Sequence, residues 1–358
     1  MAFSFFKKNS ETNNPTDDGL KVKQIIKETT DTVSLVFENP NWQYQSGQFL
    51  SLSFPIDGKE ETRSYSLCSA PNTDQDLAVT VKRVEGGLIS NYINDQVKEG
   101  DHIKVIAPAG VFTLPESKGN AFLFFGAGSG ITPLFSMIKT ILHQEADTHI
   151  TLVYTNRHED SIIFKASLAA LEVQHANFKV IHILTRPTAE WQGKTGRLNA
   201  DDIQAIYNEF PAKDQLHVYS CGPAPMMDLV AETLQKAGVA EQAIHQERFT
   251  ASTGLTESES ESESEEIVKQ LVKIRLDGEE HEVEVNPDQT ILEAALDQDI
   301  DMPFSCQSGL CTACRGRCTE GKVVMEEDDG LSEDELDGGY VLTCVSHPKS
   351  AGVVIEIE

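Results

Sequence analysis

Residues 303–318 read PFSCQSGLCTACRGRC, and residues 340–348 read YVLTCVSHP. Four cysteines in these stretches are separated by four, two and then 29 residues. This is the plant-type ligand spacing of a [2Fe–2S] cluster, in which four thiolates hold two irons. We therefore predict that the cluster ligands are Cys306, Cys311, Cys314 and Cys344.

A structural zinc site is the alternative for four cysteines. Structural zinc usually takes two short cysteine pairs, whereas here one loop holds three ligands and a distant residue supplies the fourth. Small residues in the loop let the chain wrap closely and aim backbone N–H groups at the cluster sulfurs. The spacing favours the iron–sulfur cluster, and we expect Cys318, which follows in a predicted strand, to be a packed or free thiol rather than a ligand.

The segment around these cysteines, residues 267–358, contains further strand and helix signals. Residues 267–276 and 281–285 alternate apolar and polar side chains around an Asp-Gly turn signal, and Thr290 is a predicted helix N-cap. The segment resembles the plant-type ferredoxin domain, whose flanking GKVVM and GYVLTC motifs it shares. The resemblance implies an α+β fold of the β-grasp type.

Negative charge is concentrated toward the C-terminal end. The 358 residues include 57 acidic and 29 basic ones, a net charge of −28, and residues 257–358 carry twenty of these charges. The run ESESESESEE at 257–266 has no apolar residue and repels itself, which predicts a flexible linker. We expect an N-terminal tail, two domains, the linker and a third domain, at residues 1–19, 20–116, 117–250, 251–266 and 267–358.

This acidity argues against nucleic acid or an anionic membrane as a partner. Residues 1–10 are too short and too charged for a secretory signal. Residues 121–138 lack charge, but their glycines and Pro133 suit a turn better than a lipid-facing helix. We expect a soluble, cytoplasmic protein without membrane insertion. The acidity favours a partner with a basic patch, the alternative being that it serves solubility alone.

Residues 20–114 contain short strand patterns separated by turn signals, which predict a small antiparallel β-barrel. These strands are expected at residues 20–26, 33–37, 48–54, 63–66, 77–83 and 102–107. The stretch Arg63-Ser64-Tyr65-Ser66 could pair with a phosphate, stack on a planar ring and hydrogen-bond a ring nitrogen. Gly86 and Gly87 precede a predicted helix, where N–H groups can approach a pyrophosphate.

Residues 121–125 are a continuous apolar run, typical of a buried parallel strand. GAGSGITP at 126–133 and a helical pattern follow. Strand, glycine loop and helix form the arrangement that holds a dinucleotide pyrophosphate, although this loop departs from G-x-G-x-x-G and depends on its context. Alternating strands and helices up to residue 250 predict an α/β parallel sheet that binds ligands at the carboxyl ends of its strands.

The nucleotide preference has mixed signals. Arg157 and Arg186 follow successive predicted strands, and a guanidinium can grip a 2′-phosphate in two places. Glu159 and Asp160 also follow there, and an acid at this position favours NADH. We favour NADPH, with NADH as the alternative.

The order of these motifs resembles the ferredoxin–NADP reductase superfamily, which implies a flavin site ahead of a nicotinamide site. FAD is the implied flavin and FMN its rival, with contacts from Arg63, Tyr65 and Ser66 and weaker candidates Lys82, Gly87 and Ser90. The implied nucleotide contacts are Gly126, Gly128, Gly130, Thr132, Pro133 and Gly222. The resemblance places Cys221 near the nicotinamide, although the sequence equally allows a packed thiol. Phe249 either covers the flavin or is a core aromatic at a strand end.

The whole chain from about residue 20 resembles the reductase components of multicomponent oxygenases, of the phenylacetyl-CoA epoxidase type and related hydroxylases. This implies an NAD(P)H-dependent oxidoreductase that passes electrons from NADPH through FAD and the cluster to a partner oxygenase. Nicotinamide delivers two electrons together and the cluster accepts one, so the flavin must lie between them. Tyr65, Ser66 and Cys221 are the predicted catalytic residues. The alternatives are an electron donor to a desaturase or another acceptor, and a non-catalytic redox-sensing protein.

Overall fold

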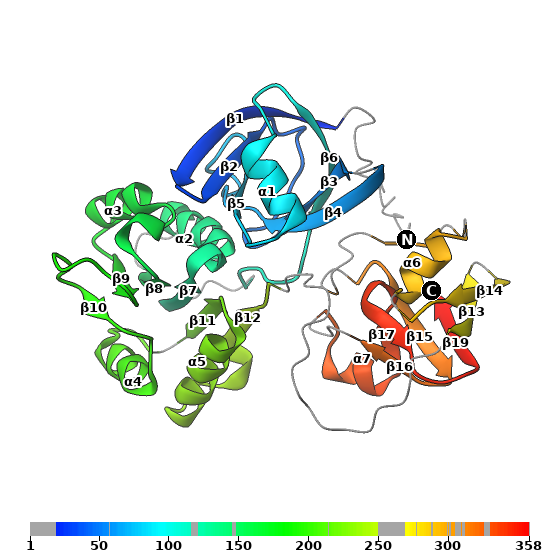
Figure 1. Cartoon of the computed structure of the whole chain (residues 1–358). Coiled ribbons are helices and arrows are strands. Elements are labelled where there is room, and N and C mark those ends of the chain that lie inside the picture. Colours follow the sequence, from blue (N-terminus) through cyan, green and yellow to red (C-terminus); the bar gives the residue numbers. More distant parts are fainter. Residues whose placement is uncertain are drawn as a thin grey trace, which may run out of the picture.

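The structure is a computed structural model, and it shows three sheet-based units along the chain (Figure 1). It describes residues 19–56, 58–115, 121–144, 148–213, 215–249, 269–276, 278–287, 289–298, 300, 302–304, 309, 312–325 and 330–357. The predicted linker and, apart from Gly19, the predicted tail therefore lie outside the described residues, and the domain boundaries remain predictions.

The first unit is an antiparallel sheet in the order β4-β3-β6-β1-β2-β5. Its strands are β1 (Leu20–Thr29), β2 (Thr32–Phe37), β3 (Phe49–Ile56), β4 (Lys59–Ser66), β5 (Leu77–Lys82) and β6 (His102–Ala109). A bridge between Leu67 and Val79 joins the end of β4 to β5, which closes the sheet into the predicted barrel. Apolar side chains fill its interior, and α1 (Leu88–Asp95) buries Ile89 and Ile93 against it.

The second unit is a parallel sheet in the order β10-β9-β8-β7-β11-β12. Its strands are β7 (Ala121–Ala127), β8 (His149–Asn156), β9 (Phe178–Leu184), β10 (Lys194–Thr195), β11 (Leu216–Cys221) and β12 (Ile244–Glu247). This confirms the predicted α/β sheet. The edge strand β10 was not predicted, because two exposed residues carry no hydrophobic pattern.

Helices cover both faces of the parallel sheet: α2 (Ile131–Gln144) and α3 (Lys165–Gln174) pack on one face, α4 (Ala200–Glu209) and α5 (Ala224–Lys236) on the other. The face with α2 and α3 also packs against the barrel, because Cys68 and Phe112 belong to its hydrophobic cluster. Hydrogen bonds cross this boundary, including one of 2.5 Å from Ser136 Oγ to the Ser69 carbonyl oxygen.

The third unit is a mixed sheet in the order β14-β13-β19-β15-β17, with β16 and β18 as a separate pair. Its strands are β13 (Gln270–Leu276), β14 (Glu279–Val285), β15 (Arg315–Glu320), β16 (Val323–Met325), β17 (Tyr340–Leu342), β18 (Ser346–Pro348) and β19 (Val353–Ile357). The helices are α6 (Ile291–Leu296) and α7 (Glu333–Asp337). Thr290 is the N-cap of α6 as predicted, and it forms a reciprocal capping box with Glu293.

The uncharged stretch at 121–138 folds as β7, a tight turn and the first half of α2. Among the described residues, no helix has the length and apolar character needed to cross a membrane.

Candidate functional site

Strand β4 carries the three main flavin candidates. Ser66 is buried, whereas Arg63 and Tyr65 are partly buried. Alternation along the strand puts Arg63 and Tyr65 on one face and Ser66 on the other. The Arg63 guanidinium donates to the Thr62 carbonyl oxygen at 2.7 Å and lies 3.4 Å from a carboxylate oxygen of Glu61, a half-exposed and therefore weak pair. Burial raises the pKa of the Tyr65 phenol, so this ring stays neutral.

The glycine loop after β5 has one well-defined shape. The Ser90 hydroxyl accepts a hydrogen bond from the Val84 N–H at 3.0 Å, and the Asn91 amide donates to the carbonyl oxygens of Val84 and Gly87. A Cβ at Gly87 would lie 2.7 Å from Ser90 Oγ, so the turn requires glycine. A pre-shaped glycine turn at the N-terminus of α1 fits a pyrophosphate. Asn91 was missed by the sequence reasoning, which stopped at Ser90.

Lys82, the remaining flavin candidate, lies at the end of β5. Its ammonium nitrogen is 3.8 Å from a carboxylate oxygen of Asp31, and both side chains are partly exposed. Lys82 lies two residues before Val84, where the glycine loop begins.

The predicted dinucleotide loop follows β7 as a single 3₁₀ turn, Gly128–Gly130, that leads directly into α2. A Cβ at Gly130 would lie 2.1 Å from the Cys221 carbonyl oxygen, so only glycine permits this approach of two backbones. The Tyr154 hydroxyl donates to the Gly128 carbonyl oxygen at 2.8 Å, and the Thr155 hydroxyl donates to that of Gly126 at 3.1 Å. These contacts hold the loop against β8.

The other candidates of this loop are internal to it or close-packed. The Thr132 hydroxyl donates to the Ser129 carbonyl oxygen at 3.0 Å, and Pro133 is buried in the first turn of α2. A Cβ at Gly222 would meet Ala127 and Met226 at 2.9 Å. Thr132 and Pro133 therefore shape the loop, while Gly222 allows the close approach of β11 and β7.

The barrel and the parallel sheet meet at three buried polar side chains. Cys221 ends β11 and is paired in register with Glu247 at the end of β12. The Ser66 hydroxyl of the barrel donates to Glu247 Oε2 at 3.4 Å. The structure thus brings two predicted catalytic residues, Ser66 and Cys221, to one carboxyl group that was not predicted. In the sequence, Glu247 is marked only as an acid in the last strand of the parallel sheet, and it is the one buried residue of that strand.

Burial dominates the electrostatics of this junction. Burial raises the pKa of Glu247 to about 8, and the hydrogen bond from Ser66 partly opposes that shift. Burial, assisted by the charge of Glu247, also raises the pKa of the Cys221 thiol. Glu247 can therefore hold a proton near neutral pH, and Cys221 is a neutral thiol rather than a nucleophilic thiolate.

Arg157 and Arg186 are brought together at the carboxyl edge of the sheet, where both are exposed and the Arg186 N–H donates to the Arg157 carbonyl oxygen at 2.8 Å. Glu159 accepts hydrogen bonds from the Thr188 N–H at 3.0 Å and the Thr188 hydroxyl at 2.6 Å. These bonds lower the pKa of Glu159. Glu159, one of the two acids that suggested NADH, therefore joins the loop after β8 to the loop after β9 through its bonds with Thr188.

Two of the four predicted cluster ligands lie in the described part of the third unit. Cys314 and Cys344 are both buried, and the N–H and hydroxyl of Thr343 donate to the Cys314 carbonyl oxygen at 3.2 and 3.0 Å. Cys306 and Cys311 lie outside the described residues. Among the residues that are described, no group of three or more potential metal ligands comes together. Cys318 lies in β15 as predicted, partly buried, with its sulfur 3.4 Å from the Glu320 carbonyl oxygen.

Phe249 is not a core residue. Strand β12 ends at Glu247 rather than at the predicted residue 249, and 42% of Phe249 is exposed. Phe249 follows Glu247 by two residues in the chain, and a role at the flavin remains a prediction.

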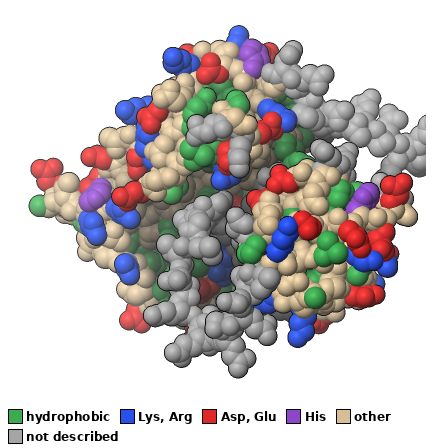
Figure 2. All heavy atoms as spheres, turned by 45° about the vertical axis from the view of Figure 1, so that its right-hand side comes forward, with side chains coloured by type: hydrophobic (Ala, Val, Ile, Leu, Met, Phe, Trp, Pro, Cys, Tyr) green, Lys and Arg blue, Asp and Glu red, His purple; other side chains and the backbone are tan. Residues whose placement is uncertain are grey.

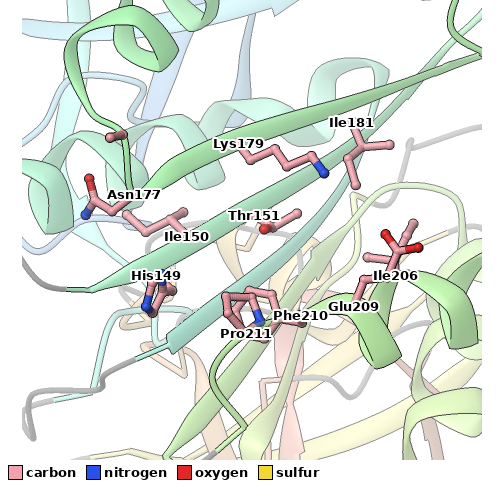
Figure 3. Close-up of a pocket in the computed structure, with 11 residues that line it drawn as sticks. His149, Ile150, Thr151, Asn177, Lys179, Ile181, Ile206, Glu209, Phe210 and Pro211 are labelled. Atoms are coloured by element: carbon pink, nitrogen blue, oxygen red, sulfur yellow. The ribbon is translucent and has the colours of Figure 1, made fainter.

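A cavity of about 210 Å³ opens at the opposite edge of the parallel sheet. Figure 3 shows that its walls come from the starts of β8 and β9 and from the end of α4, with Lys179 and Glu209 among the lining side chains. Dinucleotides bind outside the carboxyl ends of such sheets, so this cavity is not part of the candidate site.

Comparison with known proteins assigns the three units. Residues 19–114 match the oxidoreductase FAD-binding domain, residues 124–232 the oxidoreductase NAD-binding domain, and residues 274–349 the 2Fe-2S iron-sulfur cluster binding domain. The ferredoxin reductase component of 3-ketosteroid-9-alpha-monooxygenase from Rhodococcus rhodochrous is 36% identical over 94% of this chain and 96% of its own length. The chain belongs to the oxygenase reductase family.

Other members of the family are also similar to this reductase. One component of the 1,2-phenylacetyl-CoA epoxidase from Escherichia coli K12 is 33% identical over 95% of this chain and 97% of its own length. The structure of phthalate dioxygenase reductase, described as modular for electron transfer from pyridine nucleotides to [2Fe–2S], superposes with a TM-score of 0.66. It is 26% identical and covers 94% of this chain and 97% of its own.

These findings confirm the predicted fold and the oxidoreductase function. The chain is a reductase with FAD-, NAD- and [2Fe–2S]-binding domains, homologous to components that transfer electrons to partner oxygenases. The family membership also disfavours the non-catalytic redox-sensing alternative.

Proposed function

We propose that this reductase takes an electron pair from NADPH and delivers single electrons, through FAD and a [2Fe–2S] cluster, to a partner oxygenase. The observation that carries this proposal is the junction of Ser66, Glu247 and Cys221. A flavin candidate of the barrel and a nicotinamide candidate of the parallel sheet there share one buried carboxyl group. A bound flavin would accept the electron pair and release electrons singly, which is the chemistry that the other two groups lack.

The barrel residues are suited to bind and orient FAD. Arg63, with Lys82 in a lesser role, would face phosphate, the neutral Tyr65 ring would support the planar ring system, and the Ser66 hydroxyl would hydrogen-bond its reacting edge. The rigid turn at Gly87, fixed by Ser90, would hold the pyrophosphate at the start of α1. A Cβ at Gly87 would lie 2.7 Å from Ser90 Oγ, so this turn is shaped around glycine. That requirement supports the assignment of the turn to the pyrophosphate.

Glu247 is suited to position Ser66 and to hold a proton beside it. Because burial raises the pKa of Glu247 to about 8, the carboxyl is protonated over much of the neutral range. A protonated carboxyl both donates and accepts, so it can accept from Ser66 while keeping the site free of a buried negative charge. The neutral Cys221 thiol adds an uncharged wall on the nicotinamide side. Phe249, just outside, would cover the flavin until the nucleotide enters.

The nucleotide would lie along the carboxyl edge of the parallel sheet. The 126–133 loop, with its glycines, Thr132 and Pro133, and Gly222 beside it, would hold the pyrophosphate. Arg157 and Arg186 would hold the 2′-phosphate of NADPH. The two hydrogen bonds that Thr188 donates to Glu159 support NADPH over NADH, because they engage the acid that a ribose 2′-hydroxyl would otherwise require.

The cluster would be held by Cys306, Cys311, Cys314 and Cys344. The buried Cys314 and the bonds from Thr343 next to Cys344 support this ligand set, since they bring the loop and the distant cysteine together. A flexible linker at 251–266, as proposed above, would allow the third domain to accept an electron near the flavin and then donate it to an outside acceptor.

We assign substrate choice to the partner oxygenase and electron delivery to this chain, because the two relatives named above belong to a 3-ketosteroid monooxygenase and a phenylacetyl-CoA epoxidase, whose substrates are unrelated. A phenylacetyl-CoA epoxidase or a related hydroxylase is the proposed partner type, and a desaturase is the alternative acceptor. Figure 2 shows acidic side chains gathered on the visible face of the third unit. The exposed acids of β14 are Glu279, Glu280, Glu282 and Glu284, and the last three pair with Lys273, Arg275 or Lys269 of the same unit. The support for a partner with a basic docking patch is therefore the excess of acids over bases in residues 257–358.

The deciding experiment is an anaerobic titration of the purified full chain with NADPH and, separately, with NADH, followed by absorbance and electron paramagnetic resonance. We expect bleaching of the flavin bands, a reduced-cluster signal, and half-reduction at a lower concentration of NADPH than of NADH. A loaded chain that neither nucleotide reduces would contradict the relay. Equal response to both nucleotides would contradict only the NADPH preference.

A further inference from the structure

Helix α2 lies between the parallel sheet and the barrel, and it begins at the dinucleotide turn (Figure 1). Side chains three or four residues apart on its barrel-facing side make polar contacts with two loops of the barrel. These loops are residues 38–48, before β3, and residues 67–76, after β4. The second loop is the direct continuation of the strand that carries Tyr65 and Ser66. Contacts along α2 therefore join the proposed nucleotide turn to the proposed flavin strand.

Buried hydroxyl groups make two of these contacts. The Ser136 hydroxyl donates to the Ser69 carbonyl oxygen at 2.5 Å. One turn later, the hydroxyl oxygen of Thr140 lies 2.5 Å from that of Ser46. Since the Thr140 hydroxyl donates its own proton to the Ser136 carbonyl oxygen at 3.0 Å, Ser46 is the donor to Thr140. All four residues are at most 5% exposed, so water cannot replace these bonds unless the two units move apart.

The backbone beside Ser46 packs against the same helix. Gly47 has a left-handed φ of +99°, and a Cβ there would lie 2.4 Å from the terminal methyl carbon of Met137. The same Cβ would lie 1.9 Å from the carbonyl oxygen of Phe112, in the segment that connects the barrel to the parallel sheet. Only glycine permits this approach, so the loop fits closely against α2.

The third polar contact is an ion pair. Lys139 of α2 donates to a carboxylate oxygen of Asp74. The Lys139 side chain is only 16% exposed, and its ammonium nitrogen lies 4.7 Å from the centre of the Phe135 ring. The same Asp74 oxygen accepts from the Ala70 N–H at 2.7 Å, which folds loop 67–76 around the carboxylate. An ion pair with little access to water is screened less than an exposed one, so this contact holds the loop to the helix.

We infer that Lys139 is a positioning residue. With Ser136 and Thr140 it braces α2 against the barrel, and this brace sets the distance between the dinucleotide turn and the flavin strand. A small displacement of one reactant from the other slows their reaction, even where each keeps its own binding contacts. The inference rests on the proposed function for the transfer of an electron pair from nucleotide to flavin, but not for the brace itself.

Variants of the ion pair test this role in the full chain, loaded with FAD and cluster. Lys139→Met keeps the length of the side chain and removes its charge, and Asp74→Asn keeps an acceptor for the Ala70 N–H. In stopped flow we expect Lys139→Met to lower the limiting rate of flavin reduction by NADPH roughly tenfold, while the Kd of NADPH stays within about twofold of the wild type. The double variant should be no slower than Lys139→Met, because both changes break the same pair.

The matched control is Lys23→Met. Lys23 pairs with Asp76 at 2.7 Å, two residues beyond Asp74, but both partners belong to the barrel. Hydrogen exchange without nucleotide measures the brace alone. Lys139→Met should speed exchange at the amides of Ala70 and Asp74, which are bonded within loop 67–76, whereas Lys23→Met should change neither the exchange nor the limiting rate.

Unchanged exchange in Lys139→Met overturns the brace. Faster exchange with an unchanged limiting rate, or with a raised Kd in place of a lower rate, overturns the positioning role. A double variant slower than both single variants overturns the pairing of Lys139 with Asp74 as the cause.

Failure of the proposed function gives a different result. If neither nucleotide reduces the wild-type flavin, the proposed function fails, while the exchange measurement still decides the brace. If the wild type responds to NADH instead, only the preference fails, and the rates are compared with NADH. Should Lys139→Met not fold, Ser136→Ala, which breaks the bond to Ser69, should show the same lowered rate with an unchanged Kd.

Discussion

The hydroxyl of Ser66 and the carboxyl of Glu247 meet at 3.4 Å across the boundary between the barrel and the parallel sheet, although 181 residues separate them in the chain. Both side chains are at least nine-tenths buried. A carboxyl buried in this way is held neutral more easily than charged. The flavin and nicotinamide halves of the proposed site therefore share one group whose protonation both domains influence.

The protonation of Glu247 should be visible in the stability of the protein. Its pKa is raised from 4.5 to about 8, so between these values the folded state keeps a proton that the unfolded state has released. Stability must then fall as pH rises through this window. We expect Glu247→Gln to flatten that fall, measured by urea unfolding between about pH 5 and about pH 8. Glu38→Gln, at an exposed acid, should follow the wild type, and an equally steep fall in Glu247→Gln would refute the assignment.

The hydroxyl of Ser66 should matter more for electron-pair transfer than for folding. Ser66→Ala removes the donor that faces Glu247 and the proposed flavin edge, and loss of orientation at a reacting centre slows chemistry by roughly 10- to 100-fold. Stopped-flow reduction of the bound flavin by NADPH measures this rate. Ser51→Ala, whose hydroxyl lies 3.1 Å from that of Ser64, should leave the rate near that of the wild type.

The two glycines of the dinucleotide turn should respond differently to alanine. At Gly130 a Cβ would lie 2.1 Å from the Cys221 backbone oxygen, so Gly130→Ala must push β11 and the turn apart. At Gly128 a Cβ meets nothing within 4 Å, but φ of +54° is left-handed and alanine there costs about 1 kcal/mol. We expect Gly130→Ala to lose nucleotide binding in calorimetry and Gly128→Ala to keep most of it. The reverse order would argue against the packing described.

The two arginines should decide between the nucleotides. Arg157→Ala should raise the KM for NADPH by roughly tenfold, the loss of a hydrogen bond to a charged group, and leave the KM for NADH unchanged. Steady-state ferricyanide reduction measures both constants. Lys179→Ala, at the opposite edge of the same sheet, is the matched control. An equal rise for both nucleotides would mean that Arg157 holds a phosphate common to them.

The cysteines of the third unit should separate into a ligand and a packed thiol. Cys314→Ser should abolish the signal of the reduced cluster in electron paramagnetic resonance, while the flavin remains reducible by NADPH. Cys318→Ser should keep the signal, because its sulfur lies in β15 near the Glu320 carbonyl oxygen. Loss of the signal in both variants, in chains that remain folded by circular dichroism, would require a different ligand set.

The local sequence pattern was sufficient to predict most helices and strands, and also the motifs whose residues all lie within one element or its adjoining turn. The apolar run of β7, the glycine turn into α2 and the N-cap Thr290 need only neighbours in sequence, so the printed residues predict them. The strand β10 and the end of β12 before Phe249 escaped prediction, because short edge pairings depend on the strand alongside rather than on a pattern of their own.

The sequence alone determined which cofactors and which class of reaction to expect. The evidence is the spacing of the cysteines, the RSYS strand and the order of the glycine loops. In each of these, one ligand constrains one stretch of chain. Only the tertiary structure brought Glu247 to Ser66 and Cys221 and turned Glu159 toward Thr188. These pairings join residues far apart in the chain. Which buried carboxyl meets which donor is decided by how the sheets pack, and that packing leaves no local signal in the sequence.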